Sequence, residues 1–219
     1  PFVLYGIFKG RYNYKIYKYS LKFEDLPNEF DGYQITHISD IHSGSLNDKK
    51  NVEYAVELIN KQDSNLILFT GDIVNNKADE LIKWKNTFSN LKAKDGKFSI
   101  LGNHDYGDYV NWKVESQKKN NFKNLVKFQK EMGFNLLMNE NIKIKRNNES
   151  ISLIGVENWG KGRFKKKGDI DKACKGLNKN DFKIVLSHDP SHWEEILKNH
   201  NTHFHLTLSG HTHGMQFGI

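Results

Sequence analysis

The sequence is poor in cysteine, proline and long apolar runs. Its 219 residues include one cysteine and three prolines. The single cysteine, Cys174, excludes a fold built on internal disulfide bonds. No apolar run approaches the ~20 residues of a membrane-spanning helix. Hydrophobic residues make up only 37% of the chain, but the 12% that are aromatic supply buried area that a disordered chain lacks. The composition therefore predicts a folded protein.

Arginine is scarce too, although the chain carries a net charge of +7. The arginines are Arg11, Arg146 and Arg163, and the other basic residues are lysines. Recognition of base edges and bidentate binding of phosphate favour the arginine fork over the hydrated lysine charge. Nucleic acid is therefore an unfavoured partner. The lysines favour attraction to anionic substrates or to lipid headgroups.

The first 30 residues have a pattern of their own. Residues 1–8 are almost wholly apolar, and aromatic and basic residues nearly alternate over residues 12–23. A period of two predicts a half-exposed strand there. Because the chain starts at Pro1, we expect it to be part of a longer protein, with residues 1–30 as a membrane-proximal segment or strand. The expected location is the cytoplasmic face of a membrane, or the cytoplasm if this stretch is only a strand.

After residue 30, strand and helix patterns alternate, which predicts one α/β domain over residues 31–219 with largely parallel strand pairing. Strands are predicted at 33–39, 65–70, 97–101, 135–139, 142–145, 151–156, 182–187 and 205–209. Helical spacing of apolar residues predicts helices at 49–62, 79–91, 120–132, 169–177 and 191–198.

Polar side chains gather where five of the predicted strands end. The candidates are Asp40, His42, Asp72, Asn103, His104, Asp105, His188, His211 and His213. In α/β sheets, ligands bind at the carboxyl ends of the strands. One such residue is ordinarily a turn or a helix cap, but capping does not explain five strand ends in succession. Oxygen donors combined with imidazoles, without a thiolate, predict a site for Mn, Fe, Zn or Co.

Five blocks of sequence carry a resemblance to a known family. They are Asp40-x-His42, Gly71-Asp72, Gly102-Asn103-His104-Asp105, His188 and Gly210-His211-x-His213. In this order they resemble the signature of calcineurin-like metallophosphoesterases. Within this family, the sequences of the third and fifth blocks are most similar to those of a bacterial membrane-associated branch. That branch includes proteins similar to UDP-diacylglucosamine pyrophosphohydrolases. The resemblance implies a layered α/β fold with mixed β-sheets sandwiched by helices. The family continues with further strands of the second sheet, so we expect either that these strands lie beyond Ile219 or that a shorter fold closes the sheet.

The resemblance also implies two divalent metal ions, with Mn, Fe, Zn or Co as the candidates, and it assigns their ligands. The first ion would be held by Asp40, His42 and His213. The second would be held by Asn103, His188 and His211, and Asp72 would bridge both.

By the same resemblance, a hydroxide that bridges the two ions would attack the phosphorus of a phosphoester or pyrophosphate. His104 would stand near the leaving group as general acid or charge stabiliser, with Asp105 orienting its ring.

Two segments are candidate substrate contacts. Residues 106–112 follow the third block directly, and their Tyr106 could wall the site. Residues 157–168 carry Trp159 and Arg163 among lysines and glycines, and such a loop could grip an anionic headgroup or a second phosphate. A solvated surface loop with a packed tryptophan fits the same composition equally well. Asn103 is a candidate substrate contact besides its role as a ligand.

The sequence thus predicts a metal-dependent phosphoric ester hydrolase whose substrate is a phosphorylated small molecule or lipid. The N-terminal stretch favours a phosphorylated lipid or a nucleotide-lipid at a membrane surface. One alternative is a soluble, broad-specificity nucleotide phosphodiesterase or phosphatase. The other is a non-catalytic metal-binding scaffold, which the presence of Asp72 and His104 disfavours.

Overall fold

Two four-stranded sheets form the framework of the protein in the computed structural model, which describes residues 10–162 and 166–213. The first sheet is wholly parallel and consists of β1 (Ile35–Ile38), β2 (Leu66–Phe69), β3 (Gly96–Ser99) and β4 (Phe134–Leu136). The second consists of β5 (Glu140–Arg146), β6 (Glu149–Gly155), β7 (Phe182–Leu186) and β8 (Leu206–Leu208). Only the β5–β6 pair of these sheets is antiparallel.

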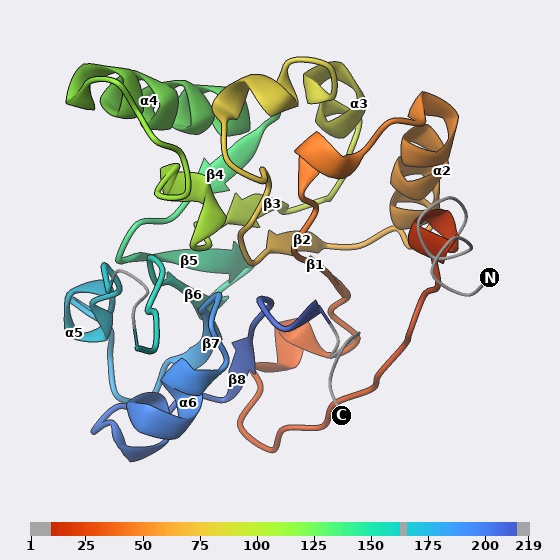
Figure 1. The fold of residues 1–219 in the computed structure, drawn as a ribbon. Helices are drawn as coiled ribbons and strands as arrows, with labels where there is room; N and C mark the ends of the chain where they lie inside the picture. Colours follow the sequence, from red (N-terminus) through yellow and green to blue (C-terminus); the bar gives the residue numbers. More distant parts are fainter. Residues whose placement is uncertain (1–9, 163–165, 214–219) are drawn as a thin grey trace.

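Helices flank both sheets (Figure 1). The helices on the side of the first sheet are α2 (Lys49–Asn60), α3 (Lys85–Ser89) and α4 (Glu115–Glu131). Those beside the second sheet are α5 (Ile170–Ala173) and α6 (Ser191–Glu195). Short 3-10 turns complete the set: η1 (Gly10–Tyr12), η2 (Asn28–Phe30), η3 (Ser43–Ser45), η4 (Ala78–Leu81), η5 (His104–Tyr106) and η6 (Leu197–Asn199). Among the described residues, none of these helices has the length and apolar character needed to cross a bilayer.

Strand β2 shows how the layers are held together, because all four of its side chains are buried. Successive side chains of a strand point to opposite faces. Ile67 and Phe69 accordingly pack with the helices on the first sheet, while Leu66 and Leu68 pack between the sheets. Burial of one such side chain contributes roughly 1.5–3 kcal/mol. The continuous apolar run 66–69 thus forms the centre of the helix–sheet–sheet–helix stack.

The predicted α/β class with largely parallel pairing is confirmed, and so are the eight predicted strands after residue 30, within two or three residues at their ends. The helix predicted over 79–91 is wrong in its middle, where η4 and α3 are separate. Between them Trp84 is buried and donates its indole N–H to the carbonyl of Ser43 at 3.0 Å. The helix predicted at 120–132 begins at Glu115, and the two late helices are shorter than predicted.

The strand predicted over residues 12–23 is also wrong. Residues 13–26, the N-terminal arm, run along the molecule without belonging to either sheet, and the arm ends in a turn over residues 24–26 (Figure 1). The start of the arm is held by Tyr12, whose hydroxyl donates to Asn47 at 2.8 Å. At its other end, the Asp25 carboxylate lies 2.7 Å from the His205 ring nitrogen Nε2. Between these anchors Tyr17 and Tyr19 are 71% and 83% exposed. The apolar stretch 1–8 lies outside the described residues.

The connection between the sheets depends on Asn139, a buried residue between β4 and β5 with φ of 56°. Its side-chain amide donates to the Glu157 carboxylate and to the Lys167 carbonyl, both at 2.9 Å. Its side-chain oxygen accepts the backbone N–H groups of Glu157 and Asp169 at 3.0 and 2.9 Å. One side chain therefore ties the sheet junction to both ends of the loop over residues 157–168.

We predict that Asn139→Ala lowers the free energy of unfolding by about 2–4 kcal/mol, because buried partners lose their hydrogen bonds. Asn147→Ala is the matched control, since Asn147 has the same left-handed backbone but is exposed in the β5–β6 turn. It reports the cost of alanine in this conformation, ~1–2 kcal/mol, together with the loss of one exposed hydrogen bond from Asn147 to the Glu29 carboxylate. Urea unfolding of the metal-free protein measures both. Equal losses in the two variants would contradict the role given to the Asn139 side chain.

Candidate metal centre

The predicted site residues meet where the two sheets present the carboxyl ends of their strands. Asp40 and His42 follow β1, Asp72 follows β2, and Asn103 follows β3. From the second sheet, His188 follows β7, and the segment that carries His211 and His213 follows β8. The two sheets therefore build one site jointly, and Figure 1 shows the chain after β8 running back toward β1.

Asp40, His42 and His213 form a first cluster of potential ligands, whose nitrogen and oxygen atoms all lie within 4.8 Å of one another. Nε2 of His213 is 3.6 Å from Oδ1 of Asp40 and 3.1 Å from Nε2 of His42. Two basic ring nitrogens and a carboxylate this close together present lone pairs to a common point. That donor set suits a divalent transition metal ion.

Asp72, His188 and His211 form a second cluster with the same spacing limit. Nε2 of His188 lies 3.1 Å from Oδ2 of Asp72 and 3.2 Å from Oδ1 of Asn103. The same Oδ2 of Asp72 is 3.8 Å from Nε2 of His42 in the first cluster. Asp72 therefore lies between the clusters. The residues to which the family resemblance assigns two metal ions are thus brought together here, with Asp72 between them.

One backbone carbonyl fixes the orientation of the His188 ring. Its Nδ1 lies 2.7 Å from the Thr70 carbonyl oxygen, which can only accept, so Nδ1 carries a hydrogen and Nε2 faces the cluster. This is how ligand histidines are held at metal sites. Burial acts to lower the pKa of His188, but the hydrogen bond and the charge of Asp72 outweigh it and raise the pKa to about 9. The buried residues around Nε2 thus favour a positive charge there, and a cation would replace the proton.

The backbone at the site adopts a conformation that L-residues rarely take. Five of the predicted ligands have φ between 44° and 69°: Asp40, His42, Asp72, His211 and His213. The left-handed region costs roughly 1–2 kcal/mol per residue, and such strain clusters at functional sites. Hydrogen bonds hold it in place. For example, the backbone N–H of His211 donates to both carboxylate oxygens of Asp40 at 3.1 and 3.0 Å.

Two glycines allow the ligand-bearing turns to lie this close together. A Cβ at Gly102 would overlap Oδ1 of Asp72, and a Cβ at Gly210 would overlap Oγ of Ser39 and a carboxylate oxygen of Asp40. A side chain at either position would displace a predicted ligand. The absence of a side chain at these two positions therefore makes room for the carboxylates of the site.

The structure corrects the role expected for Asp105. Its carboxylate does not meet the His104 ring. It is fully buried and accepts the backbone N–H groups of Asp72, Ile73 and Gly102, each at 2.9 Å. Burial and the charge of Asp72 raise the pKa of Asp105 to about 7, while the hydrogen bond from the Gly102 N–H acts to lower it. Asp105 thus joins the turns after β2 and β3.

The group that orients His104 is the Asn75 carbonyl, which lies 2.6 Å from Nδ1 of the ring. The sequence indicates only a turn at Asn75, and a backbone carbonyl leaves no signal in residue type. The backbone N–H of His104 donates to Oδ1 of Asp72 at 2.9 Å. Both contacts place His104 beside the two clusters, in a third group of potential ligands with His42 and Asp72.

Two of the expected substrate contacts are interior residues, which corrects that prediction. Tyr106 is 4% exposed, stacks on Phe122 and donates its hydroxyl to Glu157. Trp159 is 6% exposed and stacks on the His192 ring at 4.9 Å. Neither offers a face to a substrate. Arg163 lies outside the described residues, and Asn103 lies beside the second cluster, with its Oδ1 3.2 Å from Nε2 of His188.

Sequence and structure comparisons agree with this geometry. The family model described as calcineurin-like phosphoesterase matches residues 33–215. An uncharacterized metallophosphoesterase of Helicobacter pylori is 28% identical over 212 residues, covering 96% of this chain and 52% of the relative. A Danio rerio protein named "Transmembrane protein with metallophosphoesterase domain" is 24% identical over 221 residues, covering 97% of this chain and 47% of the relative. The chain thus spans about half the length of these curated relatives.

Among solved structures, the sulfate thiohydrolase SoxB of Thermus thermophilus is similar with a TM-score of 0.51 and 12% identity, covering 91% of this chain and 49% of that one. This likeness concerns the fold alone, with its two sheets and flanking helices. The family match covers the part of the chain that carries every predicted ligand. The chain belongs to the calcineurin-like phosphoesterase family and carries the domain of metal-dependent phosphoric ester hydrolases.

Proposed function

We propose that the protein hydrolyses a phosphoester or pyrophosphate bond at a pair of divalent metal ions. The observation that carries this proposal is the place of Asp72, with one carboxylate oxygen 3.1 Å from His188 of one cluster and 3.8 Å from His42 of the other. Calcineurin-like phosphoesterases use a dinuclear centre of divalent metal ions, and the metal identity stays open among Mn, Fe, Zn and Co. Such ions supply a hydroxide nucleophile near neutral pH and neutralise charge on the phosphoryl oxygens.

The ligands proposed for this centre follow the two clusters. Asp40, His42 and His213 would hold one ion, and Asn103, His188 and His211 the other. Asp72 would serve both. A shared carboxylate fits this arrangement, because two cations ~3.5–4 Å apart repel each other unless negative charge lies between them.

His104 is the residue proposed to hold the proton for the leaving oxygen. Its Nδ1 faces the Asn75 carbonyl, so its Nε2 is the nitrogen that can serve the reaction. The ring lies edge-on to the His42 ring with centroids 4.8 Å apart, which places it at the rim of the first cluster. A general acid here would protonate the oxygen that departs from phosphorus.

Asp72→Asn is predicted to lower kcat/KM by more than about 100-fold, the upper end of losses from changes around a metal site. We would load the metal-free protein with Mn, Fe, Zn or Co and assay a monoester, a diester and a pyrophosphate. Chelation should abolish turnover. Asp63→Asn is the matched control, because Asp63 also has a positive φ but lies on the surface beside Lys94.

Equal turnover by wild type and Asp72→Asn would contradict the dinuclear mechanism. A wild-type protein that binds metal but turns over none of the substrates would favour the non-catalytic scaffold. In either case circular dichroism must show that the variant is folded.

His104→Ala is predicted to discriminate between leaving groups. An alkyl ester needs protonation of its leaving oxygen, so its kcat should fall by about 10²-fold or more. A p-nitrophenyl ester leaves readily as an anion and should lose less than about tenfold. His200→Ala is the control, because His200 contacts Asp171 away from the clusters. Equal losses for both esters would exclude proton donation by His104.

We further propose that the substrate is a phosphorylated lipid or nucleotide-lipid presented at a membrane surface. The exposed N-terminal arm supports this, because Tyr17, Tyr19 and Leu21 alternate with Lys18 and Lys22 and all five are exposed. Aromatic rings favour the interface of a bilayer, and each lysine near an anionic surface contributes about 1 kcal/mol. The Danio rerio relative is named as a transmembrane protein, which agrees with a membrane location.

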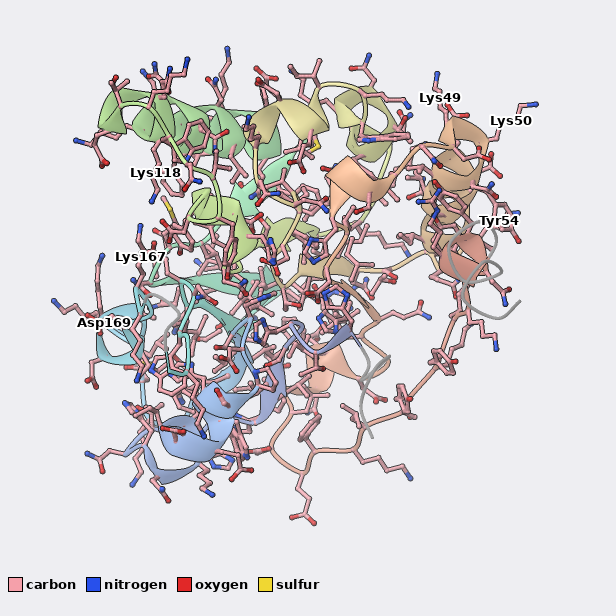
Figure 2. The ribbon with its side chains drawn as sticks, in the orientation of Figure 1. Lys49, Lys50, Tyr54, Lys118, Lys167 and Asp169 are labelled. Atoms are coloured by element: carbon pink, nitrogen blue, oxygen red, sulfur yellow. The ribbon has the colours of Figure 1, made fainter. Side chains whose placement is uncertain are left out.

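A triple variant of the arm, Lys15→Glu, Lys18→Glu and Tyr19→Ser, is predicted to weaken binding to phosphatidylserine-containing vesicles by at least about tenfold. The matched control is Lys49→Glu, Lys50→Glu and Tyr54→Ser, which makes the same changes on α2 (Figure 2). Co-sedimentation measures binding. Failure of the wild type to bind the vesicles, with full activity on nucleotides, would favour the soluble nucleotide enzyme.

A further inference from the structure

Tyr109 lies beside the candidate metal centre and has no role so far. It belongs to residues 106–112, which follow η5. Two contacts fix this segment to its surroundings. The indole N–H of Trp112 donates to the Gly107 carbonyl at 2.7 Å, and the Lys118 ammonium, labelled in Figure 2, pairs with the Asp108 carboxylate. Tyr109 is 49% exposed, in contrast to the buried Tyr106 three residues earlier.

The hydroxyl of Tyr109 accepts a hydrogen bond from the side-chain amide of Asn103 at 2.8 Å. Asn103 is 7% exposed, and its Oδ1 lies 3.2 Å from Nε2 of His188. An asparagine amide has a donor end and an acceptor end of nearly the same shape. Only the acceptor end can bind a cation. The NH₂ group is held by Tyr109, and the oxygen faces the second cluster. A phenol both donates and accepts hydrogen bonds, so Tyr109 fixes the position of the amide plane.

The ring of Tyr109 has a second contact, with the His104 ring at a centroid distance of 4.6 Å and an interplanar angle of 40°. His104 is also bounded by the Asn75 carbonyl at Nδ1 and by the His42 ring. The tyrosine ring therefore limits the directions in which the imidazole can swing. Two different parts of one side chain thus contact a predicted metal ligand and the predicted proton donor.

We propose that Tyr109 is a positioning residue of this centre: its hydroxyl anchors the Asn103 amide beside one metal ion, and its ring holds His104. This inference rests on the proposed function. Its two parts are separable by substitution, because Tyr109→Phe removes the hydroxyl and keeps the ring, whereas Tyr109→Leu removes both.

The test is a Mn²⁺ titration of the metal-free protein. At each point the free Mn²⁺ is measured by its electron paramagnetic resonance signal. Tyr109→Phe should weaken one of two Mn²⁺ sites by about 10–100-fold, the range for changes next to a metal ligand, and leave the other within about threefold. Tyr54→Phe is the matched control. Tyr54 lies on α2 at the far side of the molecule (Figure 2), with 48% exposure against 49% for Tyr109.

Turnover at saturating Mn²⁺ tests the ring. Tyr109→Phe should recover the wild-type kcat there, whereas Tyr109→Leu should stay below it, with the larger loss on alkyl esters. The thermal midpoints of the metal-free variants separate positioning from a general structural role. Tyr109→Phe removes a single hydrogen bond and should lower the midpoint by no more than about 4 °C.

Identical Mn²⁺ binding by wild type and Tyr109→Phe would overturn this inference alone. So would equal weakening of both sites together with a thermal midpoint that falls by more than the loss of one hydrogen bond explains. Failure of the wild type to bind two ions would instead contradict the proposed function, and this inference with it.

Discussion

The buried carboxylate of Asp105 is the contact on which the geometry of the centre depends. By accepting backbone N–H groups from Gly102, Asp72 and Ile73, it joins the turns that leave β2 and β3. Those turns carry Asp72 and Asn103, the two oxygen ligands proposed around His188. A buried carboxylate that lost these donors would carry the full cost of desolvation. The spacing between Asp72 and Asn103 is therefore set by backbone contacts before any metal ion binds.

The centre also concentrates backbone strain that the rest of the molecule must offset. Left-handed residues recur at the ligand positions, and each is less stable there than in an ordinary turn. The offset comes from the two apolar layers on either side of β2, where side chains such as Leu68 and Phe69 are wholly buried. The same strands thus serve both purposes. Their apolar residues stabilise the fold, and the polar residues that follow them form the candidate metal centre.

The sequence predicts the sheets well, and it also predicts that the candidate ligands meet at one edge, because both follow residue type. A run such as 66–69 has to be buried, and a strand that ends in aspartate or histidine delivers that side chain to the sheet edge. The prediction is wrong where residue type leaves the partner open. Alternation over residues 12–23 shows that two faces differ, but it names no neighbouring strand. The type of Asp105 does not tell whether it meets an imidazole or a backbone amide.

Tyr106 and Tyr109 illustrate the same limit at the site. They are identical side chains three residues apart, one in the interior and the other over His104, and only the path of the chain through residues 106–112 distinguishes them.

The origin of the ligands in both sheets has a thermodynamic consequence. An ion held by Asp72 and His188 would bridge the sandwich from one half to the other, as a cross-link that exists only in the folded state. The protein would then gain about 2.7 kcal/mol of stability when free metal is 100 times its dissociation constant. Its lifetime against proteases would follow the same concentration. In a cell starved of metal, such a chain would lose its activity and its persistence together, so that the amount of protein would itself record the metal supply.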